Sequence, residues 1–303
     1  MTTNIKDAFD NIPRRAKQTN PVVDGDYQKD GIWYCGKCNT PKEHGVMWFG
    51  IFQNMPCMCK CRQERSAQEE QKFRAEQLEM KIKGMRDAGF PDEENKLCRF
   101  ENDLKSDQQS SVIAKNYAAN FFELQKKGKG LLFFGSCGTG KTFLASCIAN
   151  ALIDKGIPCL VTSVSRIVNH LSGLYSGKQE YIDSLNNFEL LVLEDLGTER
   201  DTEYMNEFIY NIIDGRYRSN KALIITTNLT PAQLQKPSEI GRARIYSRVL
   251  EMCIPVEVVG ADMRRKKMMD DIGEFGTLLG IKNQRRIKKC RNWTISTNQA
   301  RSP

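Results

Sequence analysis

The segment GSCGTGKT, residues 135–142, has the residue types and spacing of a phosphate-binding loop. It fits G-x-x-x-x-G-K-[ST] between an apolar run and a helix-favouring segment. Glycines let backbone N–H groups turn toward phosphate oxygens, and the helix N-terminus adds partial positive charge. Lys141 is expected to reach the β- and γ-phosphates and Thr142 to ligate Mg²⁺. The residues expected to bind the nucleotide are Gly135, Ser136, Cys137, Gly138, Thr139, Gly140, Lys141, Thr142 and Phe143.

Polar side chains end two later apolar runs, LLVLED (190–195) and ALIITTN (222–228). We expect Glu194 to hold Mg²⁺, usually through water, and Asp195 to orient and deprotonate an attacking water. Asn228 is a candidate for placing that water beside the γ-phosphate. Each is an ordinary strand-end residue when taken alone, and the order loop, acid pair, polar strand end favours a hydrolytic site.

Two arginine-bearing segments follow, GRARIYSRVLEM (241–252) and ADMRRKK (261–267). A γ-phosphate in the transition state requires positive charge, which a neighbouring subunit can supply. Arg248 is the candidate finger reaching into a neighbour's site, and Arg264 the candidate sensor within its own subunit. For each of the two, the alternative is an ordinary solvated arginine on the surface. Arg244 lies at helical spacing from Arg248.

Five of the eleven cysteines fall between residues 35 and 61, as C-x2-C followed by C-x-C-x-C. Short cysteine spacings in a chain without a secretion signal favour structural Zn²⁺ over disulfides. Cys35 and Cys38 are the expected ligands on one side. Two of Cys57, Cys59 and Cys61 complete the site, and Cys59 and Cys61 are favoured. Idle or reactive thiols are the alternative.

Five apolar runs alternate with helical stretches from about residue 130, which predicts an α/β fold with a parallel sheet covered on both faces. Because one run lies between the loop and the acid pair, the strand ending in Asn228 should lie between their two strands. The expected parts are a disordered segment (1–30), a zinc-binding domain (31–61), a helical linker (62–97), the core (98–270) and a basic tail (271–303). The linker should hold a long exposed helix ending at Gly89.

The net charge of +8 is concentrated at the C-terminus. Residues 275–303 hold seven basic residues and no acidic one, which suits an arm for nucleic acid or an acidic partner, or a solvated disordered tail. No apolar run approaches about 18 residues, so no membrane contact is expected. The first residues lack a signal-peptide pattern, and a cytoplasmic protein is expected.

The order GSCGTGKT, LLVLEDLG, ITTNL, RIYSR and GADMR, within about residues 98–270, resembles the AAA+ ATPases of the DnaC/DnaI helicase-loader group. Transposition helper ATPases of the IstB type share much of it. The resemblance implies a five-stranded P-loop core with a reduced or absent lid, hydrolysis of ATP, and self-association through the ATPase site. It assigns Arg248 as finger and Arg264 as second sensor. Glu194 departs from the family's usual Asp, which puts the turnover rate in doubt.

The resemblance also implies partners. Residues 164–181 occupy the place of a helix that helps to grip single-stranded DNA, and the zinc-bearing region is the usual docking module for the helicase. The leading hypothesis is a loader of a hexameric replicative helicase, released by ATP hydrolysis. The alternatives are an IstB-like transposition helper acting on duplex DNA and a zinc-dependent adaptor with a vestigial ATPase.

Overall fold

The computed structural model describes residues 22–48, 50–105, 107–197, 203–237, 240–275 and 278. Two compact units divide the chain, Met1–Met80 and Lys81–Pro303. Most of the predicted disordered segment (1–30) and most of the basic tail (271–303) lie outside the described residues.

The first unit contains two short antiparallel hairpins. β1 (Tyr27–Lys29) pairs with β2 (Ile32–Tyr34), and β3 (Glu43–Trp48) pairs with β4 (Ile51–Pro56). Every residue of β1 and β4 is exposed. Among the described residues of this unit the buried ones are Cys35, Lys42 and Cys59, so it has almost no apolar core.

α2 (Lys60–Gly89) begins directly after the second cysteine group and ends at Gly89, as predicted. A Cβ at Gly89 would lie 2.2 Å from the carbonyl oxygen of Cys159, so only glycine fits there. The second unit begins within this helix, earlier than the predicted boundary at residue 98. The reason is that Phe90, 1% exposed, packs into the core with Ile82 and Met85 beside it.

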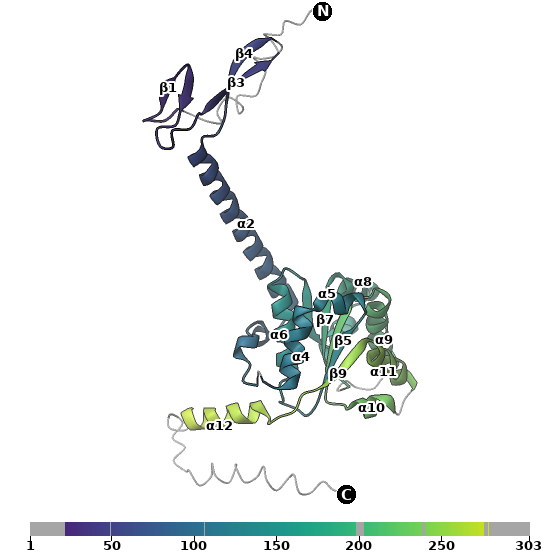
Figure 1. The fold of residues 1–303 in the computed structure, drawn as a ribbon. Coiled ribbons are helices and arrows are strands. Elements are labelled where there is room, and N and C mark those ends of the chain that lie inside the picture. Colours follow the sequence, from purple (N-terminus) through teal and green to yellow (C-terminus); the bar gives the residue numbers. More distant parts are fainter. Residues whose placement is uncertain are drawn as a thin grey trace, which may run out of the picture. The chain divides into compact units, whose positions relative to one another are not determined.

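A five-stranded parallel sheet forms the centre of the second unit (Figure 1). Its strands, in spatial order, are β6 (Cys159–Ser163), β7 (Leu190–Leu196), β8 (Ala222–Thr227), β5 (Gly130–Phe134) and β9 (Cys253–Glu257). The predicted α/β class and parallel sheet are confirmed. β8, which precedes Asn228, lies between the loop strand β5 and the acid strand β7, as its order in the sequence indicated.

Alternate strand residues face opposite sides of the sheet, and each side has its own core. Leu131 and Phe133 of β5 join one cluster, with α4 (Gln109–Ala119) and α6 (Lys141–Ile153). Leu132 joins the other, with α7 (Val164–Gly173), α9 (Glu203–Arg218) and α11 (Ile240–Met252). Figure 1 shows α4 and α6 on one side of the sheet and α9 and α11 on the other.

Shorter elements connect these layers. They are α3 (Glu93–Lys96), η2 (Phe100–Asn102), α5 (Phe121–Lys126), α8 (Lys178–Ser184), η3 (Leu185–Asn187), α10 (Pro231–Gln235) and α12 (Met263–Phe275). In the part of the chain that is described, α12 is the one helix after β9, and the reduced or absent lid stays a prediction. Every described helix is too short or too polar to cross a bilayer.

Arg216 of α9 is fully buried beneath the amino ends of the strands. Its guanidinium donates hydrogen bonds to four backbone carbonyls, those of Leu185, Phe188, Glu189 and Ala222. Burial lowers the pKa of Arg216 to about 10, so it remains charged at neutral pH. The side chain therefore joins η3 to the residues just before β7 and to the first residue of β8.

Candidate nucleotide-binding site

The loop between β5 and α6 packs closely against the segment that follows β9. Gly135, Gly138 and Gly140 have φ values of 143°, 75° and 107°, in the region that favours glycine. A Cβ at Gly138 would lie 1.8 Å from Asp262 Oδ1, and the N–H of Met263 donates to the carbonyl of Gly138 at 2.9 Å. Glycine is required both for the backbone turn and for this close approach.

Lys141 begins α6 and is 6% exposed. Its Nζ donates to the carbonyls of Gly135 and Ser136, at 2.9 and 2.8 Å, and to Asn228 Oδ1 at 2.8 Å. Burial lowers the pKa of Lys141. Two of the predicted site residues, Lys141 and Asn228, are thus in direct contact although they lie 87 positions apart along the chain.

The two acids of β7 differ in setting because the strand is irregular there. The pairing of β7 with β8 shifts between Leu193 and Leu196, and Asp195 has a φ of 57°. A positive φ at a non-glycine residue is uncommon and strained. With this backbone conformation Asp195 is exposed to solvent, while Glu194 is buried and only 8% exposed.

Glu194 has the chemistry of an Mg²⁺ ligand. Burial raises its pKa to about 7, with smaller contributions from Asp195 and Asp92. A hydrogen bond with Thr142 opposes this rise, and no donor from the described residues reaches Glu194 Oε1. Mg²⁺ takes oxygen ligands, and this pair supplies a carboxylate and a hydroxyl. The residues present therefore fit the ion, and Mg²⁺ binding stays a prediction.

A cavity of about 430 Å³, which we call the phosphate cavity, lies beside these groups, and Glu194 is not among the residues that line it. Its lining includes Cys137, Lys141, Thr142, Asp195, Asn228 and Arg264. The structure therefore brings five predicted catalytic or magnesium-binding residues, and Cys137 of the loop, to the carboxyl edge of the sheet.

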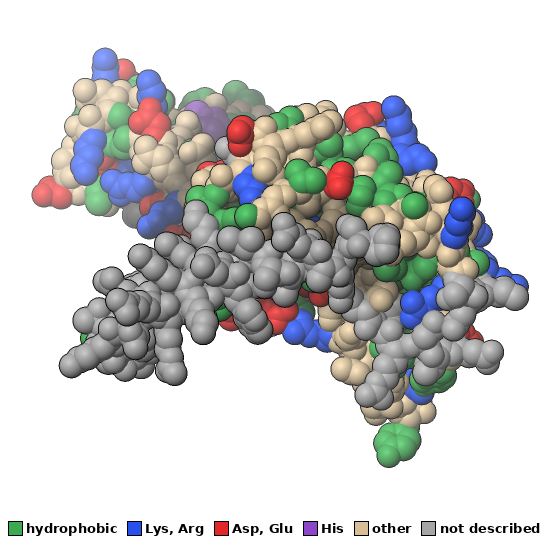
Figure 2. All heavy atoms as spheres, turned by 90° about the horizontal axis from the view of Figure 1, so that it is seen from below, with side chains coloured by type: hydrophobic (Ala, Val, Ile, Leu, Met, Phe, Trp, Pro, Cys, Tyr) green, Lys and Arg blue, Asp and Glu red, His purple; other side chains and the backbone are tan. Residues whose placement is uncertain are grey.

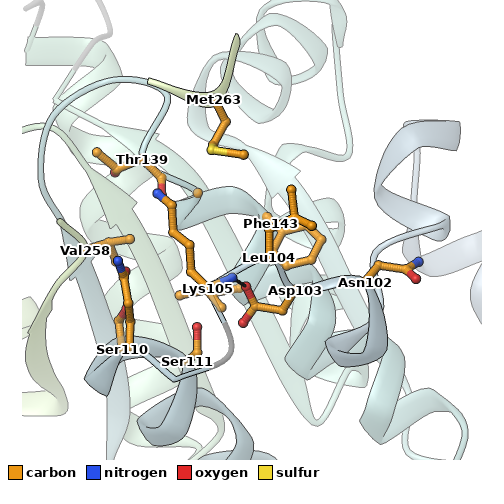
Figure 3. Close-up of a pocket in the computed structure, with 13 residues that line it drawn as sticks. Asn102, Asp103, Leu104, Lys105, Ser110, Ser111, Thr139, Phe143, Val258 and Met263 are labelled. Carbon is orange, nitrogen blue, oxygen red and sulfur yellow. Dashed lines mark hydrogen bonds between the residues drawn. The ribbon is translucent and has the colours of Figure 1, made fainter. Parts of the chain in front are cut away.

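A second, smaller pocket adjoins it, of about 190 Å³, and Gly140, Phe143 and Met263 line both. We call it the Asp103 pocket, after a residue on the segment before α4. Figure 3 shows Asp103 and Lys105 entering from that segment, with Phe143 on α6 and Met263 on the segment after β9. Lys105 Nζ donates to the carbonyl of Thr139 at 3.0 Å. Sequence reasoning missed this pocket, because residues 102–111 match no motif.

Arg248 does not line the phosphate cavity of its own chain. Its guanidinium lies 4.0 Å from the ring centre of Tyr217, with ion pairs to Asp214 at 3.6 Å and Glu251 at 3.4 Å. Arg244, one turn earlier, is exposed. A finger acts on a neighbouring subunit, so a single chain leaves this assignment a prediction.

In the first unit, the sulfurs of Cys35, Cys38, Cys59 and Cys61 lie within 4.8 Å of one another. Cys61 Sγ is 3.6 Å from Cys35 Sγ and 3.5 Å from Cys59 Sγ. These separations approach the roughly 3.8 Å expected between sulfurs around tetrahedral Zn²⁺ with bonds of about 2.3 Å. Cys57 is outside the cluster and contacts the carbonyl of Pro41. The thiols therefore fit Zn²⁺, with the cysteine pair that the spacing favoured, and the metal stays a prediction.

Side chains around the cluster hold it in shape. Thr40 Oγ1 lies 3.0 Å from Cys38 Sγ and accepts the N–H of Lys60 at the start of α2. Asp26 Oδ1 accepts the N–H of Gly36, between the first two cysteines, and its other oxygen pairs with Lys42. Such second contacts orient metal ligands in structural sites.

Basic side chains do not form one continuous stripe over the described surface in Figure 2. That view shows lysines and arginines interspersed with acidic and hydrophobic groups. The predicted basic arm is in residues 275–303, almost all of which lie outside the described residues.

Comparison with known proteins supports the nucleotide site. The family model of the IstB-like ATP binding proteins matches residues 60–270, beginning at the first residue of α2. The replicative helicase loader DnaC of Buchnera aphidicola subsp. Schizaphis graminum is 31% identical over 140 residues, 44% of this chain and 56% of that protein. The loader DnaI of Bacillus subtilis is 27% identical over 150 residues, 46% of this chain and 48% of that protein.

The chain thus spans about half the length of the curated relatives it matches. A crystal structure of DnaI covers 59% of this chain and 98% of its own, with a TM-score of 0.50 and 25% identity.

Proposed function

The chain belongs to the family of IstB-like ATP-binding proteins, and from this premise we propose that it loads a hexameric replicative helicase onto single-stranded DNA. Hydrolysis of ATP is the release switch in this proposal. The observation that carries it is the combination of a complete phosphate-loop site with the similarity of the same unit to DnaI and to proteins named helicase loaders.

The phosphate cavity accounts for ATP binding in the proposal. The triphosphate follows the loop into the cavity, and Lys141 exchanges carbonyl acceptors for β- and γ-phosphate oxygens. Thr142 and Glu194 would hold Mg²⁺, which, when bound, neutralises charge on the phosphates. Ionisation of Glu194 accompanies that binding, since its pKa near 7 keeps about half of it protonated at neutral pH.

Asp195 and Asn228 carry the proposed hydrolysis. Water attacks the γ-phosphorus, the bond from that phosphorus to the bridging oxygen breaks, and Asp195 takes the proton of the water. Asn228 fixes the position of the water through the amide that already contacts Lys141. Arg264, which lines the cavity, adds positive charge from the same subunit.

Arg248 completes the site of a neighbouring subunit in this proposal, so activity requires self-association. The test mixes two inactive variants, Lys141→Ala and Arg248→Ala. In a mixed oligomer, the Arg248→Ala subunit supplies an intact phosphate loop and the neighbouring Lys141→Ala subunit supplies an intact Arg248. Mixing should therefore restore part of the ATPase activity. Arg244→Ala, an exposed arginine on the same helix, is the matched control and should keep wild-type activity. Failure of mixing to restore turnover contradicts the finger role.

Residues 164–181 and the cysteine unit are the proposed contacts to single-stranded DNA and to the helicase. Between α7 and α8, Tyr175 is fully exposed, and Lys178 Nζ lies 2.6 Å from the hydroxyl of Tyr204 and 5.3 Å from its ring centre. Exposed aromatic rings beside a cation suit stacking of unpaired bases. In the cysteine unit, exposed Met47, Ile51 and Phe52 offer apolar contacts.

Co-purification with a replicative helicase tests the whole proposal. With ATP and Mg²⁺ we expect a stable complex, lost on hydrolysis and retained with a non-hydrolysable analogue. ATP-dependent assembly on duplex DNA without helicase capture instead supports the transposition helper. Capture of the helicase without measurable hydrolysis, even with single-stranded DNA, supports the adaptor with a vestigial ATPase.

A further inference from the structure

The Asp103 pocket contains polar atoms that lack partners. Asp103 Oδ1 accepts the N–H of Lys105 at 2.9 Å, whereas no donor of the described residues reaches Asp103 Oδ2 or Gln108 Oε1. Both unpaired atoms are hydrogen-bond acceptors, and both are shielded from water. A buried acceptor without a donor costs about 1–3 kcal/mol. A ligand that brings donors to these atoms would recover that free energy.

The rest of the pocket is suited to a flat apolar ring. Leu104, Phe143, Val258 and Met263 contribute to its walls. Figure 3 shows Asp103 and Phe143 lining the same pocket from different elements. Since Gly140 and Phe143 also line the phosphate cavity, one ligand can extend from one space into the other. The volumes of about 190 and 430 Å³ together suit a nucleotide-sized molecule.

We propose that the Asp103 pocket receives the base of the nucleotide and that Asp103 and Gln108 select adenine by accepting hydrogen bonds from its 6-amino group. Adenine carries two N–H donors on this nitrogen, which match two unpaired acceptors. A 6-oxo purine presents a carbonyl oxygen at that position, where it meets acceptors and forms no hydrogen bond. This inference rests on the proposed nucleotide site and adds the groups that set its base specificity.

The test compares ATP with purine riboside triphosphate, which lacks only the 6-amino group. Calorimetric titration of the full chain should give ATP a preference of about tenfold or more, since hydrogen bonds to a charged acceptor are the stronger kind. In Asp103→Ala this preference should fall several-fold, to the part that Gln108 contributes. In Asp103→Asn, the amide can donate, so inosine triphosphate should gain affinity relative to ATP.

Asn102→Ala is the matched control, because Asn102 borders the pocket while its amide points away from it (Figure 3). This variant should keep the full preference for ATP. Binding of inorganic tripolyphosphate should be equal in all variants, which reports an intact phosphate loop and a folded unit.

Equal affinity of the wild-type chain for ATP and purine riboside triphosphate overturns the inference. So does an Asp103→Ala variant that binds both more weakly but keeps their ratio, or a wild-type preference for GTP that this substitution removes. If the wild-type chain binds tripolyphosphate and no nucleoside triphosphate, the base pocket is wrong and the phosphate loop stands. If it binds no phosphate compound, the proposed nucleotide site itself fails.

Discussion

The fold of each unit of this chain is stabilised by different interactions. In the described part of the first unit, the buried residues are two of the clustered cysteines and one lysine, and the hairpins expose Met47, Ile51 and Phe52. The second unit has an apolar core on each face of its sheet. A unit with so little apolar burial depends on cross-links or metal for its fold. Loss of metal should therefore unfold one unit and leave the other intact.

The largest expected effect is that of Cys59→Ser. Removing one of four thiol ligands from a site that supplies most of the folding free energy should unfold the hairpins. Zinc content, measured in the purified chain, should fall to near zero, and amide signals of residues 22–59 should collapse to unfolded positions. ATP binding should persist.

Cys57→Ser is the control, because Cys57 lies in the same segment and outside the thiol cluster. Cys57→Ser should keep the zinc content of the wild-type chain and the folded positions of the amide signals of residues 22–59. Equal loss of zinc in both variants would contradict the assigned ligand set, and loss of ATP binding in Cys59→Ser would contradict the independence of the units.

Arg216→Ala should destabilise the second unit by roughly 3–5 kcal/mol, because four backbone carbonyls lose the donor that the buried guanidinium supplies. The free energy of unfolding would be measured by urea titration followed by far-ultraviolet circular dichroism. Arg218, two positions later and paired with Asp214, is 77% exposed, and Arg218→Ala should cost less than about 1 kcal/mol. A similar decrease in the free energy of unfolding in both variants would show that Arg216 stabilises the sheet no more than an exposed arginine does.

The pH dependence of the second unit should reveal Glu194. Its folded pKa of about 7 lies above its ordinary value of 4.5, so the folded state binds this proton more tightly. The resulting stability is complete below about pH 4.5 and lost as the pH rises through about 7, a change of roughly 3 kcal/mol. Glu194→Gln should remove this component when metal-free chains are unfolded in urea at several pH values. If the free energy of unfolding of Glu194→Gln changed with pH as it does in the wild-type chain, the assignment to Glu194 would be wrong.

The smallest effect is expected at an exposed ion pair. Arg166 donates two hydrogen bonds to Asp92, but both side chains are nearly half exposed, at 45% and 49%. A double-mutant cycle with Asp92→Ala and Arg166→Ala should give a coupling of at most about 1 kcal/mol. A much larger coupling would mean that surface pairs, and not only the two cores, hold the second unit together.

The nucleotide edge of the sheet was largely predictable from the sequence. Lys141, Glu194, Asp195 and Asn228 each follow or end an apolar strand, and parallel strands carry their carboxyl ends to one edge. The irregularity that exposes Asp195 and buries Glu194 was not predictable, because it arises from the pairing of β7 with β8.

The Asp103 pocket and the packing of Phe90 into the core of the second unit had no local signal. Asp103 and Gln108 acquire their setting from α6 and the segment after β9, which are far away in sequence. Phe90 looks like any aromatic residue after a polar helix, and only the packed structure shows it to be core. Of the five clustered cysteines, the sequence favoured the four whose sulfurs lie together in the structure. Three of these four, Cys35, Cys38 and Cys59, precede the region that the family model matches.

The position of β5 in the sheet has a consequence for synthesis of the chain. β5 is the first of the five strands to leave the ribosome, yet it pairs only with β8 and β9, the last two. β6 and β7 can pair with each other as soon as both have emerged. The phosphate loop, attached to β5, stays without the two strands that flank β5 until β8 and β9 have been made. ATP can therefore meet a loop whose supporting strands are in place only after β9 has emerged, which makes nucleotide binding a late step in the folding of this unit.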